Sequence, residues 1–311
     1  MHFITFEYNE ELRLGVIIDE ERLVDLLEIG VPFKDMPELI KRLSGNQHEH
    51  RYLRDKVGSA QVNAVRALKD VRLRAPLMPS TVLCAGSNYH AHNAEKANTP
   101  LSGIEPEFFI KTSDCVVGPH DNIVHDAHLT NKLDLETELA IVIGKPGRHI
   151  PVDQALEHVF GYTIANDVTA RDRQVRKTED GFTWYELGRG KAFDSSLPLG
   201  PVIVTQDQIP DPQMLTLRTR INGELRQQSS TRDMIWSCAE LIHFFSINFT
   251  LKPGMVILTG TPAGTAWSVD SELGGKWIPA DGLVAASRYA LPGDVLESEI
   301  VEIGILHNQV V

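Results

Sequence analysis

The chain has 311 residues, of which 42% are hydrophobic, and a formal net charge of -12. This is the composition of a globular protein with enough apolar material for a sizeable core, and the length suits one large domain with a smaller one. The net charge is negative and the sequence has no long run of Lys and Arg. Both features argue against nucleic acid and anionic membrane surfaces as main partners.

Three cysteines are present, Cys84, Cys115 and Cys238, and their spacing is not that of a metal site. We expect free thiols in a reducing compartment. The first residues lack a basic region followed by an apolar one, and no run approaches the ~18 apolar residues of a membrane span. The sequence therefore predicts a cytoplasmic protein without a leader or a membrane-spanning segment.

The N-terminal part of the chain predicts a small α/β unit. Residues 1–31 alternate apolar and polar positions, which is typical of strands. Between 35 and 69 the spacing becomes helical, with a helix expected in MPELIKRL, a break at GNQHEH and a second helix in VNAVRALKDV. Residues 72–79 predict a connecting strand and a hinge. We place a small N-terminal domain at 1–75 and a catalytic domain at 76–311.

After Pro79 the composition changes to short apolar runs separated by Gly, Pro and Asn. Many short strands with few helices predict an α+β architecture that is mostly β. The helices that we expect here lie in a short segment from Tyr89 to Ala97, in PVDQALEHV and in DMIWSCAELIHFFS. The last residues, LPGDVLESEIVEIGILHNQVV, predict a turn and two closing strands.

The segment GSNYHAHNAEKA, from Gly86 to Ala97, has a Gly/Asn turn followed by helix-compatible residues. His92 and Glu95 are three positions apart, so on a helix they share a face, where the carboxylate can orient the imidazole and raise its basicity. The pair is therefore a candidate for activating water. The spacing also allows two exposed polar residues on a surface helix, which is the commoner arrangement.

In LDLETELAIVIG, residues 133–144, two carboxylates lie inside an apolar, β-branched run. Glu136 and Glu138 are two positions apart, so on a strand they project from the same face. A second such run, GYTIANDVTA, ends at Asn166 and Asp167, and Asp167 would supply a third carboxylate. An all-carboxylate set favours a hard divalent cation, Mg2+ or Mn2+, with Ca2+ also allowed and zinc disfavoured. The alternative is the solvated face of an edge strand.

Two lysines stand at strand ends beside apolar stretches, Lys111 in EFFIKTSD and Lys191 in GRGKAFDSSLPLGP. A lysine there can hold a substrate carboxylate or stabilise an enolate, and the alternative is a surface lysine whose stem covers apolar groups. Further along, LKPGMVILTGTPAGT predicts a turn, a buried strand and a second turn. The backbone N–H and hydroxyl groups of Thr259, Gly260 and Thr261 could bind an oxyanion, although a purely structural turn fits equally well.

Seven motifs stand in an order that resembles the fumarylacetoacetate hydrolase family: GxNYxxHxxE, PEFFxK, DxExELAxVIG, NDVTARDxQ, GKxFDxxxPLGP, LxPGxVIxTGTPxG and PGDxxxxxIxxIGxLxN. The resemblance runs from about residue 81 to the C-terminus. It implies a β-rich, mixed sandwich-like roll, usually a homodimer, with Mg2+ or Mn2+ at the mouth. The residues that take the positions of the metal ligands are Glu136, Glu138 and Asp167, and those of the catalytic dyad, carried on a lid that orders over the substrate, are His92 and Glu95.

The same resemblance assigns Lys191 to catalysis and places Lys111, Gln174 and Thr261 against the substrate. It implies that a 2-oxo or 2,4-dioxo acid chelates the metal, that water activated by His92 cleaves a C–C bond, and that the metal and Lys191 hold the resulting enolate. The same enolate chemistry without water attack gives decarboxylation of a 2-oxo diacid or tautomerisation of a hydroxydienoate. The motifs alone do not decide among these activities.

The chain departs from the family pattern in two places. Residues 178–189 and 267–291 form longer segments than the pattern has, and TGTP continues as AGTAW in place of a Gly-Val-Gly type turn. Both segments are expected near the mouth of the site or at a subunit contact. They therefore bear on the size and class of the substrate.

Overall fold

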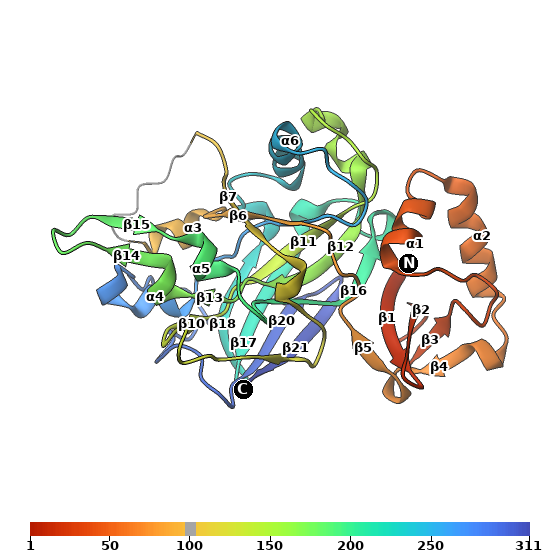
Figure 1. Ribbon diagram of the computed structural model, residues 1–311, viewed down its shortest axis with the longest axis horizontal. Helices are drawn as coiled ribbons and strands as arrows, with labels where there is room; N and C mark the ends of the chain where they lie inside the picture. Colours follow the sequence, from red (N-terminus) through yellow and green to blue (C-terminus); the bar gives the residue numbers. More distant parts are fainter. Residues whose placement is uncertain (97–103) are drawn as a thin grey trace.

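The computed structural model describes residues 1–96 and 104–311 (Figure 1). The α-helices are α1 (Met36–Leu43), α2 (Gln47–Gly58), α3 (His90–Ala94), α4 (Arg171–Gln174), α5 (Leu187–Lys191) and α6 (Cys238–Asn248). The strands up to the middle of the chain are β1 (His2–Tyr8), β2 (Glu11–Ile17), β3 (Arg22–Asp25), β4 (Val65–Ala67), β5 (Arg72–Arg74), β6 (Val82–Gly86), β7 (Glu107–Lys111), β8 (Val116–Val117), β9 (Asn122–Ile123), β10 (Leu133–Asp134) and β11 (Thr137–Ile143). The later strands are β12 (Val159–Asn166), β13 (Thr169–Ala170), β14 (Val175–Lys177), β15 (Thr183–Tyr185), β16 (Leu197–Thr205), β17 (Thr216–Ile221), β18 (Glu224–Ser230), β19 (Val256–Leu258), β20 (Val295–Ile300) and β21 (Gly304–Val310).

Among the described residues, twelve strands form one large mixed sheet. Its order is β4-β3-β2-β1-β16-β12-β11-β19-β6-β7, with β5 beside β1 and β8 beside β16. A second sheet, β18-β17-β20-β21-β9, packs against β11, β12 and β16. Helices α1 and α2 flank the N-terminal strands, and α6 lies over the central ones (Figure 1). The predicted fold, α+β and mostly β, is confirmed.

The N-terminal strands are continuous with the large sheet because β1 pairs with β16 through His2↔Val204 and Phe3↔Ile203. The division into domains at 1–75 and 76–311 stays a prediction.

Strands β11 and β12 are buried along their whole length. The side chains of Leu139, Ile141 and Ile143 enter the core that includes α6, whereas those of Ala140 and Val142 enter the core beneath α1. A strand covered on both faces needs apolar residues at consecutive positions, which explains the unbroken run LAIVI. Glu136 and Glu138, at the N-terminal end of β11, are thus held by a buried strand.

The helix predicted for VNAVRALKDV is wrong. Residues Val62–Ala64 and Leu68–Asp70 form short 3-10 turns around β4, which pairs with β3. The β-branched valines suit a strand, and pairing with β3 outweighs the helical spacing. The break predicted at GNQHEH is wrong too, because α2 begins there, where the side chain of Asn46 accepts a hydrogen bond from the N–H of Glu49 at 3.2 Å.

Other helices differ from the predictions in type or length. The segment PVDQALEHV contains a 3-10 helix, Val152–His158, in place of an α-helix. Helix α6 begins only at Cys238, after a capping box formed by Ser237 and Glu240. Helices α1 and α3 and the closing strands β20 and β21 are confirmed, although Ala97, at the end of the prediction for α3, lies outside the described residues.

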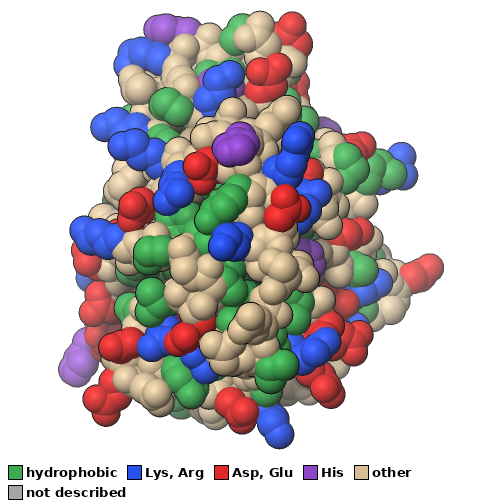
Figure 2. Space-filling view, turned by 90° about the vertical axis from the view of Figure 1, so that its right-hand side faces the viewer, with side chains coloured by type: hydrophobic (Ala, Val, Ile, Leu, Met, Phe, Trp, Pro, Cys, Tyr) green, Lys and Arg blue, Asp and Glu red, His purple; other side chains and the backbone are tan. Residues whose placement is uncertain are grey.

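The surface on the side of α1 and α2 shows acidic and basic side chains interspersed with hydrophobic ones (Figure 2). None of the helices in the described ranges is long and apolar enough to cross a membrane. The three cysteines are buried free thiols, as predicted.

Asn88 ties the turn before α3 to two other segments. Its Nδ2 donates to the carbonyl oxygens of Trp236 and Thr259 at 2.9 and 2.8 Å, and its Oδ1 accepts from the N–H of Trp236 at 2.7 Å. An Asn88→Ala variant leaves these groups without partners, so we expect its free energy of unfolding to fall by about 2–4 kcal/mol. Denaturant unfolding followed by circular dichroism measures the change. The control Asn63→Ala, at an exposed position, should change it by less than about 0.5 kcal/mol, and equal effects of the two variants would contradict the prediction.

Candidate active site

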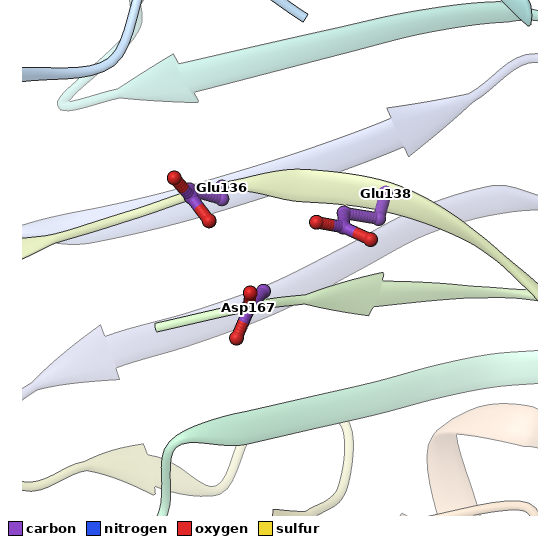
Figure 3. A group of neighbouring side chains, drawn as sticks. All are labelled: Glu136, Glu138 and Asp167. Carbon is purple, nitrogen blue, oxygen red and sulfur yellow. The ribbon is translucent and has the colours of Figure 1, made fainter. Parts of the chain in front are cut away.

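The antiparallel pairing of β11 with β12 brings the three predicted metal ligands together. Glu138 lies opposite Ala165, and the N–H of Asp167, just beyond β12, donates to the carbonyl oxygen of Glu136 at 2.8 Å. One carboxylate oxygen from each of Glu136, Glu138 and Asp167 lies within 4.8 Å of the others. Figure 3 shows the three side chains, which come from two neighbouring segments, around a common space. All three are buried, which excludes the solvated edge strand.

Two cations balance part of this negative charge. Nζ of Lys191 lies 2.6 Å from Oε2 of Glu136 and 2.5 Å from Oδ2 of Asp167. Arg171 donates Nη2 to Glu136 and Nε to Asp134, the latter at 2.8 Å. Burial works to raise the pKa of Glu136, but Arg171 and Lys191 outweigh it and hold that pKa well below its ordinary value. Burial likewise opposes the charge of Lys191, yet the carboxylates of Asp167 and Glu136 raise its pKa.

The remaining carboxylate oxygens indicate room for one more cation. Oε2 of Glu138 accepts a hydrogen bond from the N–H of Gly260 at 2.6 Å, but Glu138 forms no ion pair with another described residue. Burial, with the charges of Asp167 and Glu136, raises its pKa well above the ordinary value. Oδ1 of Asp167 makes no hydrogen bond within the described residues, although Nζ of Lys111 lies 2.9 Å away. This all-oxygen donor set fits a hard divalent cation.

The N–H of Gly260 is one of the groups that the sequence suggested for binding an oxyanion. In the structure this N–H binds a carboxylate of the chain itself. The Oγ1 of the neighbouring Thr261 donates to the carbonyl oxygen of Thr137 at 3.0 Å. The turn therefore positions Glu138 and the end of β11.

His92 and Glu95 form a buried pair at the end of α3. Nδ1 of His92 lies 3.4 Å from Oε2 of Glu95, whose Oε1 accepts from the N–H of Gly264 at 2.9 Å. Burial lowers the pKa of His92 well below its ordinary value and raises that of Glu95 to about 8. The site thus holds a neutral imidazole beside a carboxyl that is mostly protonated at neutral pH. An exposed surface helix is excluded for these two residues.

These groups surround a cavity of about 60 Å³. The predicted residues on its wall are His92, Glu136, Glu138, Asp167, Gln174, Lys191 and Thr261. The other two lie directly behind the wall, Glu95 beside His92 and Lys111 beside Asp167. Nζ of Lys111 donates to the backbone oxygen and Oγ of Ser196 at 2.9 and 3.0 Å, so this lysine holds Asp167 and does not face the cavity. The predicted contact of Lys111 with substrate stays a prediction.

Several further residues of the wall were not assigned from the sequence, among them Arg171, Trp267 and Lys96. Arg171 follows Asp167 by four positions in NDVTARD, so the motif contained a signal for it. The other two could not be placed from spacing, because a tertiary contact brings them together: Nζ of Lys96 lies 5.3 Å from the centroid of the Trp267 ring.

The two extended segments meet at this cavity. Residues 178–189 form the turn of the β14-β15 hairpin and the start of α5, and residues 267–291 form short 3-10 turns and loops. The rings of Tyr185 and Trp267 are 6.2 Å apart, and Nζ of Lys177 donates to the carbonyl oxygen of Glu272. The expectation that these segments lie near the mouth of the site is confirmed.

Residues 81–311 match the family described as Fumarylacetoacetate (FAA) hydrolase C-terminal. The chain belongs to the fumarylacetoacetate hydrolase family. Over an alignment of 326 residues it is 34% identical to an oxaloacetate tautomerase of Bacillus subtilis, with 100% of both chains covered. Among solved structures, a fumarylacetoacetate hydrolase of Exiguobacterium antarcticum superimposes with a TM-score of 0.76 at 36% identity, over 100% of this chain and 99% of that one. A maleylpyruvate hydrolase of Sphingobium, in complex with manganese(II) and pyruvate, superimposes with a TM-score of 0.75 at 28% identity, over 100% of this chain and 99% of that one.

We predict that the carboxylate set binds a divalent cation and that one neutral substitution in the set weakens this binding. We expect Glu138→Gln to weaken Mn2+ binding by about 100-fold or more, since loss of outer partners alone lowers metal affinity by about 10- to 100-fold. The fold should survive, because burial already disfavours the charge of Glu138. Isothermal titration calorimetry measures the affinity, and Glu302→Gln, at an exposed position, is the control. Equal Mn2+ affinity in wild type and Glu138→Gln would contradict the assignment.

The raised pKa of Glu95 predicts a pH-dependent stability. Its carboxyl has an ordinary pKa of 4.5 and a folded pKa of about 8, so the folded state holds a proton that the unfolded state has released. The stability of the wild type relative to Glu95→Gln should therefore be greatest below 4.5 and fall as the pH rises through about 8. Thermal unfolding of both proteins across this range measures the difference. A difference that is constant with pH would contradict the assigned state of Glu95.

Proposed function

We propose that the protein is a divalent-cation-dependent enzyme that interconverts the enol and keto forms of a short 2-oxo dicarboxylic acid of the oxaloacetate type. The observation that carries the proposal is the small cavity in which a cation-binding carboxylate set faces a neutral, buried imidazole. The full-length similarity to an oxaloacetate tautomerase supports it.

The proposed cofactor is Mg2+ or Mn2+, held by Glu136, Glu138 and Asp167. When bound there, the ion supplies a Lewis acid that polarises the 2-oxo group of the substrate. Lys191 lies against two of these carboxylates, and its ammonium can stabilise the negative charge that develops on an enolate oxygen. In a water-poor cavity such a fixed charge acts more strongly than it would in bulk water.

Conversion of enol to ketone moves protons and breaks no bond between heavy atoms. One proton leaves the C2 hydroxyl and one joins C3. Because Nδ1 of His92 faces Glu95, its Nε2 is the nitrogen that can exchange a proton with the substrate. Burial keeps this imidazole neutral, so it can accept the proton, and Glu95 orients the ring. His92 and Glu95 are therefore the proposed proton-transfer pair.

The second candidate is hydrolysis of a C–C bond in a 2,4-dioxo acid such as an acylpyruvate. The observation that favours it is the same His92 and Glu95 pair, which can activate water, and a hydrolase is among the similar structures. Hydrolysis requires room for a water molecule and for the departing acyl group as well as the 2-oxo acid. The full-length similarity to an oxaloacetate tautomerase favours the first candidate, and so we place tautomerisation first.

Three expectations complete the proposal. We propose that the enzyme is a homodimer, as the family resemblance implies, and that it acts in the cytoplasm, to which its acidic composition and free buried thiols are suited. We also keep the boundary of the catalytic domain at about residue 76.

The activity is tested by following the enol of oxaloacetate by ultraviolet absorbance and NMR, with metal-stripped protein and with added Mg2+. We expect Mg2+-dependent acceleration of ketonisation, lowered by about 100-fold or more in His92→Ala, because a positioned acid–base group contributes about that much. The matched control is His90→Ala, an exposed histidine of the same helix. An equal loss in both variants would contradict the role of His92.

The same samples distinguish the alternatives. Mg2+-dependent formation of pyruvate and a carboxylic acid from an acylpyruvate, without acceleration of ketonisation, would overturn the tautomerase in favour of the hydrolase. Release of CO2 from oxaloacetate would identify a decarboxylase, and turnover confined to a hydroxydienoate would identify an isomerase of that substrate.

A further inference from the structure

Lys96 lies on the cavity wall just beyond α3 and has no role in the chemistry proposed above. Its Nζ donates to Oγ of Ser87 at 2.9 Å and lies 5.3 Å from the centroid of the Trp267 ring. The carbonyl oxygen of Ser87 accepts from Nδ2 of Asn93 at 2.8 Å, which fixes the turn before α3. The ammonium is thus held at one place in the wall.

This ammonium differs from the other cations of the cavity in its partners. Lys191 forms ion pairs with Glu136 and Asp167, and Arg171 forms ion pairs with Asp134 and Glu136. Lys96 forms no ion pair with a described carboxylate. Glu107 lines the same cavity and acts on Lys96 only from a distance.

An ammonium that is partly withdrawn from water and has no counter-ion among the described carboxylates is unfavourable. Burial, reinforced by the positive charge of Arg171, lowers the pKa of Lys96 to about 7. An anion that entered the cavity beside Lys96 would restore its charge and gain a charge-assisted hydrogen bond. The wall is therefore complementary to a ligand that is negatively charged at this end.

The carboxylate set lines the same cavity, and it takes the chelating end of a 2-oxo acid through the proposed cation. Because one cavity is lined by both the carboxylate set and Lys96, a single ligand that chelates the cation can also present an anionic group to Lys96. We propose that Lys96 is the specificity-determining residue that binds the distal carboxylate of a short 2-oxo dicarboxylic acid. The inference rests on the proposed function for the position of the chelating end.

Two non-reacting ligands test this without turnover. L-Malate and L-lactate share the chelating 2-hydroxy acid and differ only by the distal carboxylate of malate. Calorimetry in the presence of Mn2+ should show that the wild type binds malate about 10- to 100-fold more tightly than lactate, as expected for one hydrogen bond to a charged group. Lys96→Met should remove this preference and leave the affinities for lactate and Mn2+ unchanged.

The matched control is Lys276→Met, which removes a lysine with an exposed side chain close to Lys96 in the structure, where Lys96 pairs with Gly275. It should keep the preference for malate. Lys96→Gln provides a second neutral variant in case Met disturbs the packing of Trp267. A wild type that does not prefer malate, a preference that survives in both Lys96 variants, or an equal loss of malate and lactate affinity would overturn the proposal.

These outcomes are separate from those of the activity assay. If ketonisation fails while the Lys96-dependent preference for malate holds, the proposed reaction is wrong and the diacid site stands. If ketonisation proceeds and the preference does not depend on Lys96, the reaction stands and the role of Lys96 is wrong.

Discussion

The site depends on one strand pairing, that of β11 with β12. Its register sets Glu138 beside Ala165 and places Asp167, at the end of β12, against the backbone of Glu136. The side chain of Asn166 accepts a hydrogen bond from the N–H of Glu136 at 2.9 Å and so fixes the last residue before β11. A shift of one residue would turn the carboxylates to the opposite face of the sheet. Burial of both faces of β11 and β12 makes such a shift unfavourable.

Three carboxylates within 4.8 Å of one another inside the protein repel one another strongly when they are charged. The neighbouring Lys and Arg side chains compensate only part of this negative charge. Arg171 and Lys191 stabilise the charge of Glu136, whereas Glu138 has no ion-pair partner among the described residues and its pKa is raised. A divalent cation held by the three carboxylates would resolve this imbalance. Lys96, on the wall of the same cavity, forms no ion pair with a described carboxylate.

The two extended segments, 178–189 and 267–291, contribute residues to the wall of the cavity. Two cationic groups lie near the ring of Trp267, since Nζ of Lys96 and Cζ of Arg171 are 5.3 and 4.9 Å from its centroid. The N–H of Lys276, further along the same segment, donates to the carbonyl oxygen of Glu95 at 2.8 Å. The segment 267–291 therefore holds Glu95 through its backbone and lines the cavity with Trp267.

The sequence by itself determined the mostly β fold, the family and the convergence of Glu136, Glu138 and Asp167, because strand alternation and ordered motifs are local properties of the chain. It failed for 47–71, where the capping of α2 by Asn46 and the pairing of β4 with β3 outweigh helical spacing. It also left Lys96 and Trp267 unassigned. Only the tertiary structure decided these points, because the burial, the partners and the charge state of a side chain depend on segments distant in the sequence.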